Sequence, residues 1–373
     1  MIPVALPGGD FYPALAVSLV CLATLLTWVI LLCVNSEARA RVRARPRFSL
    51  VSMGLLTAAG AVFPAGHAAR WIEAREAAAV EARHTMVLTQ AATVDGLSLP
   101  AGTQLRVLEP GRLDTFQQAR FAAPVAVAGV PVLRLTRYLE ETDAHGWRVT
   151  GVSARLAADA TIARWHCAAS HQIELRSTAA NGGLQFSSCH LAAGNPTPPQ
   201  AIETPPVNTR ATAGARAGVA AGQRATLPSG TWVSLRDGTA LASDPARASG
   251  WLLHTDGSEA VDVVGLPLHK ADLRLDLSRR LTSFEGALAR ELVLGPMTYP
   301  AGTRVASATP ALHGAQPGDL VFSPARGRSA QRRDGAPVTA GHSVLQSPTG
   351  NVRAVLANRA AGVLDFAGIG SAP

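Results

Sequence analysis

The N-terminal quarter of the chain contains two long segments without a charged residue. Residues 14–34 (ALAVSLVCLATLLTWVILLCV) form the first, and a helix of this length spans the hydrocarbon core of roughly 30 Å. Residues 48–66 form the second, in which small residues suited to close helix packing recur. These small residues are Gly54, Ala58, Ala61 and Ala65. The pattern predicts a transmembrane hairpin within residues 1–70, with helices at about 14–34 and 48–66.

The connection between the two apolar segments, residues 35–47, is rich in arginine. Its arginines are Arg39, Arg41, Arg43, Arg45 and Arg47. Such clusters stay on the cytoplasmic side and can contact anionic lipid headgroups. We therefore expect the N-terminus and the large C-terminal part to lie outside the cytoplasm. The alternative, that the arginines bind nucleic acid or a soluble partner, is not needed to explain them. Residues 67–84, rich in Ala and Glu, are predicted to form a juxtamembrane helix.

A six-residue pattern (apolar–x–Gly–apolar–x–apolar) recurs through the rest of the chain. It occurs at residues 94–99, 127–132 and 263–268, at 294–299 with Gly one place early, and at 162–167 without Gly. Pro-Ala-Gly-Thr or a close relative recurs at residues 100–103, 228–231 and 300–303. Alternating strand-like residues follow, so each unit reads as a strand, a turn and a returning strand.

One hairpin buries too little apolar surface to be stable alone, but several in tandem can share a core. The sequence therefore predicts an all-β extracytoplasmic repeat domain of tandem β-hairpins after the two helices. A first set of repeats covers residues 85–194 and a second covers 219–373. Residues 195–218 between them are proline-rich and are predicted to be a stiff linker. The pattern leaves open whether the hairpins form a meander, a barrel or a solenoid.

The recurring strings resemble the tandem AAGT and GxLxSxxLA β-repeats of uncharacterised bacterial envelope proteins. The resemblance covers much of residues 85–310. It implies a bacterial envelope β-repeat protein and carries no activity that could be transferred to this chain. From the predicted topology we expect a location in the bacterial inner membrane, with the N-terminus and the β-repeat domain in the periplasm.

Two of the four cysteines, Cys167 and Cys189, fall in one outward-facing repeat. One period earlier their positions hold Val132 and Ala154, an apolar pair that would face each other between strands. We expect a disulfide across one hairpin, because the compartment is oxidising. Neighbouring residues on a strand point to opposite faces, so the adjacent His166 and His190 would face away from the cysteines. This argues against a metal site, and no cofactor is expected.

The net charge of +8 is partly concentrated in residues 35–47 and is otherwise diffuse, so it does not indicate nucleic-acid binding. One further basic run is interpreted as an exposed loop, with contact to anionic lipid or glycan polymer as the functional alternative. It consists of Arg326, Arg328, Arg332 and Arg333.

Residues 316–322 (QPGDLVF) and the later His342 resemble part of the NlpC/P60 cell-wall peptidase signature. That family needs an upstream nucleophilic cysteine, and no cysteine follows Cys189, so a Pro-Gly turn is the preferred interpretation.

The leading hypothesis is a non-catalytic, membrane-anchored envelope protein that contacts lipids, other envelope proteins, itself or cell-wall polymer. The alternatives are a cell-wall or envelope-polymer modifying enzyme, with its site near His342 or the cysteine repeat, and a subunit of a multi-protein membrane complex.

Overall fold

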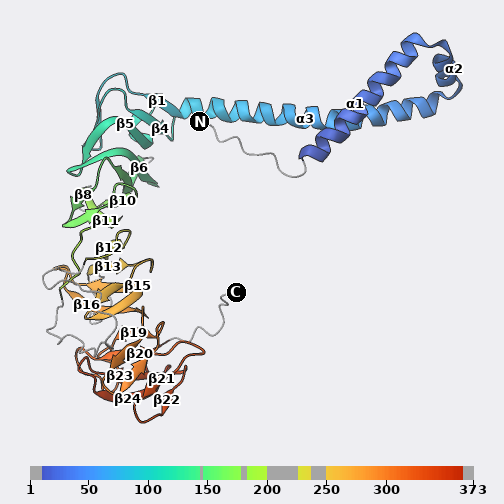
Figure 1. Ribbon diagram of the computed structural model, residues 1–373. Helices are drawn as coiled ribbons and strands as arrows, with labels where there is room; N and C mark the ends of the chain where they lie inside the picture. Colours follow the sequence, from blue (N-terminus) through green and yellow to red (C-terminus); the bar gives the residue numbers. More distant parts are fainter. Residues whose placement is uncertain (1–10, 143–145, 178–182, 200–225, 237–248, 364–373) are drawn as a thin grey trace. The chain divides into compact units, whose positions relative to one another are not determined.

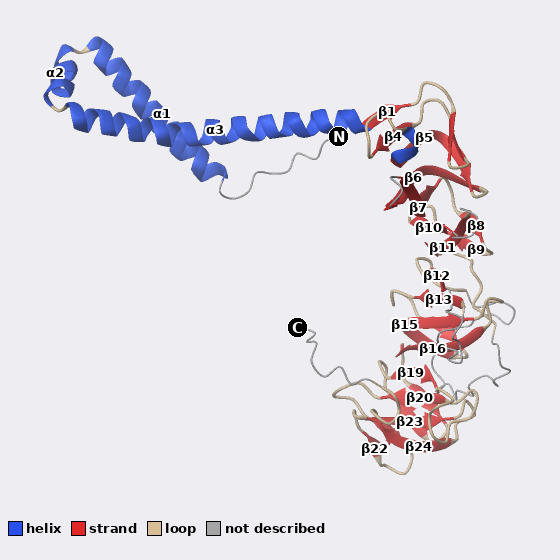
Figure 2. Cartoon of the chain, turned by 180° about the vertical axis from the view of Figure 1, so that it is seen from behind, coloured by secondary structure: helices blue, strands red, loops and turns tan. Residues whose placement is uncertain are grey.

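The computed structural model describes residues 11–142, 146–177, 183–199, 226–236 and 249–363. It divides into two compact units, Met1–Met86 and Val87–Pro373. The first unit is helical and the second consists of strands (Figure 1, Figure 2). Each unit is described by itself.

The N-terminal unit contains α1 (Phe11–Val34), α2 (Ser36–Ala44) and α3 (Pro46–His84). Both α1 and α3 are long and apolar enough to cross a membrane. The arginine-rich connection, predicted as a loop, is largely the helix α2, because the Asn35 side chain accepts a hydrogen bond from the Glu37 N–H at 2.9 Å and caps it. The two predicted helices at 48–66 and 67–84 are one continuous helix, since the Ala-rich sequence after Pro64 favours helix.

The contact between α1 and α3 is made at Gly60, which is not one of the small residues predicted to pack against a neighbouring helix. The Ser18 hydroxyl donates to the carbonyl oxygen of Gly60 at 2.5 Å. A Cβ atom on Gly60 would lie 2.9 Å from Leu22 Cδ2, so glycine permits this close approach. The predicted small residues Gly54, Ala58, Ala61 and Ala65 are exposed instead. Their packing against another helix therefore stays a prediction.

One large antiparallel sheet of 16 strands runs through the second unit. Its main path follows chain order, so strands close in sequence pair with each other. The path is β1 (Thr85–Val87), β4 (Gln104–Val107), β5 (Phe116–Val127), β6 (Val130–Thr142), β7 (Gly146–Leu156), β10 (Gln172–Ser177), β11 (Leu184–His190), β12 (Trp232–Arg236), β13 (Gly250–His254), β15 (Leu266–Leu275), β16 (Leu281–Leu288), β19 (Arg304–Ser307), β20 (Leu320–Ser323), β23 (His342–Gln346) and β24 (Val352–Ala357), with β14 (Val261–Val263) paired to β15.

Short strands form smaller sheets beside the large one. They are β2 (Ala92–Val94) with β3 (Leu97–Leu99), β8 (Ala160–Ile162) with β9 (Trp165–Cys167), and β17 (Leu292–Leu294), β18 (Met297–Tyr299), β21 (Ala330–Arg332) and β22 (Pro337–Val338).

The six-residue pattern marks two-residue hairpin turns. Asp95 and Gly96 have φ angles of 51° and 76°, as a type I′ turn requires at both central positions. Ala163 and Arg164 take the same left-handed conformation without glycine, with φ angles of 47° and 67°. In residues 294–299 the central pair begins with Gly295, whose φ is 57°, and continues with proline. Glycine at the first central position is typical of a type II′ turn, which explains its early place.

The three Pro-Ala-Gly-Thr segments make the same local contacts. In each, the Thr hydroxyl donates to the Pro carbonyl oxygen at 2.7 or 2.8 Å. The Gly N–H donates to the carbonyl oxygen of a leucine at 2.7 or 2.8 Å. This leucine is the last residue of an earlier strand or directly follows it. The sets are Pro100, Gly102, Thr103 and Leu88; Pro228, Gly230, Thr231 and Leu191; and Pro300, Gly302, Thr303 and Leu288.

In the first half of the large sheet, the core contains a row of residues that pair with one another across β4, β5, β6, β7 and β10. Leu105 pairs with Ala119, Ala119 with Leu135, Leu135 with Ala154, and Ala154 with Ile173. All five are buried, so one face of the sheet is continuous core.

The predicted linker, residues 195–218, lies mostly outside the described residues. Its first residue is packed: the buried Asn195 donates to the carbonyl oxygens of His166 and Ala192. Strands β11 and β12 pair directly, with Cys189 opposite Val233, so the sheet continues across the proline-rich segment.

Candidate functional site

Cys167 and Cys189 form a disulfide, with their Cα atoms 5.9 Å apart and both residues buried. The predicted pairing is confirmed, but the two residues do not belong to one hairpin. Cys167 lies on β9, which pairs with β8, whereas Cys189 lies on β11 in the large sheet. The bond therefore ties a small hairpin to the sheet, because the type I′ turn folds β8 and β9 back as their own pair.

The histidines beside the cysteines lie half-exposed, as the strand alternation predicted for His166 and His190. The His190 ring centre is 4.4 Å from that of His171, and its Nδ1 lies 3.1 Å from the Gly230 carbonyl oxygen. Within the part of the chain that the structure describes, no three His, Cys, Asp or Glu side chains are arranged to hold a metal ion.

The four arginines of the basic run are exposed, as predicted, and Arg326, Arg328 and Arg333 lie in loop or turn positions, whereas Arg332 ends the short strand β21. The Arg328 guanidinium donates to the carbonyl oxygen of Ala301. Arg332 Nε lies 3.1 Å from Asp334 Oδ2. These contacts occupy part of the charge that could bind an anionic polymer. The five arginines between the apolar segments are all exposed, and Arg41 makes a long contact of 3.8 Å with Glu37.

The segment that resembles a peptidase signature folds as a turn. The Gln316 N–H donates to Asp319 Oδ2 at 2.8 Å, and the Asp319 N–H donates to the Gln316 carbonyl oxygen at 3.0 Å. His342 begins β23 and is exposed. Its neighbour Ser343 is buried and lies 2.7 Å from both the Ser323 hydroxyl and Asn358 Oδ1. These contacts stabilise the strands.

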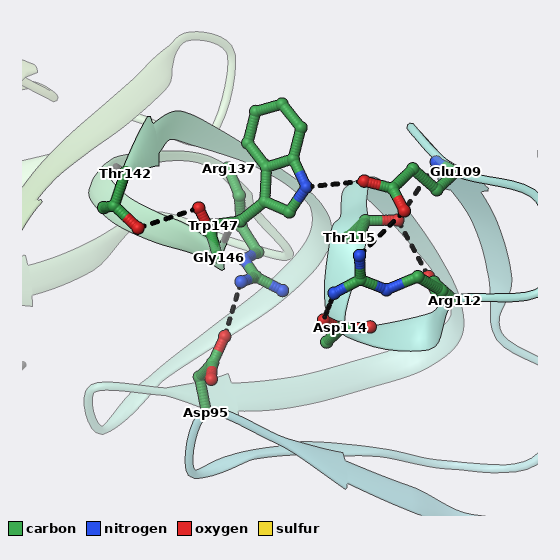
Figure 3. A network of polar contacts seen from close by, with 9 residues as sticks. All are labelled: Asp95, Glu109, Arg112, Asp114, Thr115, Arg137, Thr142, Gly146 and Trp147. Atoms are coloured by element: carbon green, nitrogen blue, oxygen red, sulfur yellow. Dashed lines mark hydrogen bonds and ion pairs between the residues drawn. The ribbon is translucent and has the colours of Figure 1, made fainter. Parts of the chain in front are cut away.

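A cluster of polar contacts that the sequence did not indicate lies where β4 ends and β7 begins (Figure 3). The Trp147 indole N–H donates to Glu109 Oε1 at 2.9 Å, and Arg112 Nη1 donates to Glu109 Oε2 at 2.7 Å. Arg112 Nη2 also donates to Asp114 Oδ2 at 2.6 Å. The hydrogen bonds from Trp147 and then Arg112 lower the pKa of Glu109. The hydrogen bond from Arg112 likewise lowers the pKa of Asp114.

Beside this cluster lies an arginine that is only 4% exposed, Arg137 on β6. Its Nη2 donates to Asp95 Oδ2 at 2.5 Å, and its guanidinium carbon is 4.1 Å from the centre of the Phe116 ring. Among the described residues its Nη1 has no hydrogen-bond partner. Burial lowers the pKa of Arg137, and the Asp95 carboxylate acts in the opposite direction. The pairing joins positions 42 residues apart, so no local pattern could have shown it.

An open cleft of about 350 Å³ lies over the outward side chains of β15, β16 and β19, with residues 361–363 along one side. Its charged groups are paired with one another or with neighbours. Arg304 Nη2 lies 2.6 Å from Glu285 Oε2, and Asp272 Oδ1 lies 2.6 Å from His254 Nδ1. Serine hydroxyls and the apolar side chains of Phe284, Val321 and Val363 complete the lining.

No protein-family model, curated protein or solved structure matches this chain. Any function proposed for it therefore rests on the residues described above.

Proposed function

We propose that the chain is a membrane-anchored protein of the bacterial envelope whose β unit lies outside the cytoplasm and serves binding or assembly without catalysis. One observation carries this proposal: two helices with exposed apolar side chains precede, in the same chain, a β unit with a buried disulfide.

The helices have the surface of membrane spans. Within the most apolar stretch of α1, only 6% is buried, and in α3 only 12%. Val20 and Leu26 on α1 are 64% and 62% exposed, and Leu50 and Leu55 on α3 are 70% and 66% exposed. Exposing this much apolar surface to water is costly, whereas lipid tails solvate it. The exposed arginines between the helices favour the cytoplasmic side and anionic headgroups.

The disulfide supports an extracytoplasmic place for the β unit. Such bonds persist in oxidising compartments and are rare in the cytoplasm. The orientation inferred from the arginines places the β unit in such a compartment, so two independent features agree.

The tandem hairpins support binding or assembly. Two-residue hairpin turns and the same Pro-Ala-Gly-Thr contacts recur, which is how repeat proteins build a long surface from short units. The partners proposed are membrane lipids at the N-terminal unit and envelope proteins, a second copy or cell-wall polymer at the β unit. For the polymer, the exposed Arg326 and Arg333 are the candidate contacts.

Reporter fusions test the topology. A fusion at residue 42 should be active only as a cytoplasmic reporter, and a fusion after residue 90 only as an extracytoplasmic one. Replacing the five arginines of residues 35–47 with alanine should reduce this asymmetry. Replacing the four arginines of the basic run with alanine is the matched control and should leave it unchanged. Cytoplasmic activity of both fusions in the unmodified chain would contradict the proposal.

A further inference from the structure

The last strand of the large sheet, β24, has an open edge. It pairs on one side with β23, where Val344 lies opposite Val355 and Ser343 opposite Leu356. Along its other side, no strand among the described residues pairs with it. The carbonyl oxygen of Ala357 accepts hydrogen bonds from the N–H groups of Ala360 and Ala361, and the other backbone groups that point to this side are available to another strand.

This edge lacks the features that usually prevent strand addition. Residues 352–357 (VRAVLA) contain no proline, lysine or glycine. The single charged residue, Arg353, is engaged: its Nε lies 2.6 Å from Asp319 Oδ2, and its Nη2 donates to Gln316 Oε1 at 2.6 Å. Val355 is 44% exposed, although its partner Val344 is fully buried. The apolar core therefore extends to this last strand, which lacks the polar outer face of a capping repeat.

We propose that β24 pairs antiparallel with β24 of a second copy of this chain, so that two sheets join across a two-fold axis. The other end of the sheet makes a poor edge, because β1 has only three residues and begins directly after His84, the last residue of α3. A sheet with one long edge forms a closed two-fold pair, whereas two usable edges would give an open filament.

The sequence of β24 is compatible with pairing to itself. An antiparallel pair with two-fold symmetry is centred on a residue, so Arg353 lies opposite Val355 when the centre is Ala354 and opposite Ala357 when the centre is Val355. Arg353 therefore never faces its own copy, and the repulsion of like charges in a cross-strand pair is avoided. In the register centred on Val355, this side chain would face Val355 of the second copy.

The mass of the purified full-length protein in detergent, followed over a range of concentrations, tests the proposal. Val355→Lys should weaken the dimer by about tenfold or more, because it places a charge in the new strand pair. Leu277→Lys is the matched control: Leu277 is 62% exposed but lies in the turn between β15 and β16, away from the edge. It should leave the dimer unchanged. Both variants should keep the Cys167–Cys189 bond, which checks that they fold.

Cysteine cross-linking locates the contact. In a Cys21→Ala/Cys33→Ala background, oxidation should link two chains through Ala354→Cys, through Val355→Cys, or through a mixture of the two, depending on the register. Leu277→Cys should give little product. A monomer at all concentrations, a dimer that Val355→Lys does not weaken, equal cross-linking at all three positions, or a strand of another polypeptide paired with β24 would each overturn the proposal. These measurements do not depend on topology, so they can fail while the reporter fusions succeed.

Discussion

Arg137 is almost completely buried, yet its ion-pair partner Asp95 is 60% exposed, with 2.5 Å between the Nη2 and Oδ2 atoms. Asp95 sits in the left-handed turn between β2 and β3, and Arg137 lies in the middle of β6. The pair therefore holds a small hairpin against the large sheet. The Phe116 ring covers the guanidinium and keeps it from water.

Asp95→Asn should lower the free energy of unfolding by about 2 kcal/mol, because it leaves the buried guanidinium without its counter-charge. Asparagine suits the left-handed turn position as well as aspartate does, so the change isolates the charge. Urea unfolding of the β unit, followed by far-UV circular dichroism, provides the measurement. Asp114→Asn is the control at an exposed pair and should cost less than about 1 kcal/mol. Equal losses in the two variants would contradict this account of Arg137.

The contacts of Glu109 predict a dependence on acid. Its pKa is lowered from 4.5 in the folded protein by Trp147 and Arg112, so the unfolded state binds more protons as the pH falls. The stability from this group is present above about pH 4.5 and is lost as the pH falls through the folded pKa. The difference in melting temperature between the native protein and Glu109→Gln should therefore be larger at neutral pH than in acid. Trp147→Phe removes the main hydrogen-bond donor to Glu109. Its loss of melting temperature relative to the native protein should therefore also be larger at neutral pH than in acid. A difference that stays constant with pH would contradict the prediction.

The disulfide joins residues with a sequence separation of 22. For a loop of this length, the chain-entropy model predicts a contribution of about 3 kcal/mol to the free energy of unfolding. Peptide mapping without reductant should recover Cys167 and Cys189 in one linked species. The double variant Cys167→Val/Cys189→Ala should unfold at a higher temperature than Cys189→Ser alone. The single change leaves a thiol and a hydroxyl in a buried place, which costs roughly 1–3 kcal/mol more. Free reaction of both thiols with an alkylating reagent in the folded protein would disprove the pairing.

Tyr299 should make the protein sensitive to alkali. Its hydroxyl donates to Gln346 Oε1 at 2.6 Å, both side chains are buried, and burial raises the pKa of Tyr299. Above about pH 10 the unfolded tyrosine ionises while the folded one stays protonated, so stability falls as the pH rises. Tyr299→Phe should lose about 1–3 kcal/mol at neutral pH, since Gln346 loses a partner, and should show a smaller decline in alkali. Tyr138→Phe, at a position 49% exposed, is the control and should follow the native curve.

Features set by neighbouring residues were predictable from the sequence alone. The uncharged runs at residues 14–34 and 48–66 specify helices because their length and composition permit little else. Gly96 and its equivalents mark hairpin turns because the left-handed conformation favours glycine. The cysteine pairing followed from the strand period, which places corresponding positions of a repeat on the same face.

Tertiary structure decided which hairpin packs on which strand. It placed Cys167 on a hairpin separate from the strand of Cys189, packed α3 on α1 through Gly60, and buried Arg137 beside Asp95. Each of these contacts joins groups that are remote in sequence or depends on which face of an element becomes buried. Local turn preferences and periodicity do not specify which face is buried or which partner it packs against. That outcome depends on the apolar surface that many strands bury together.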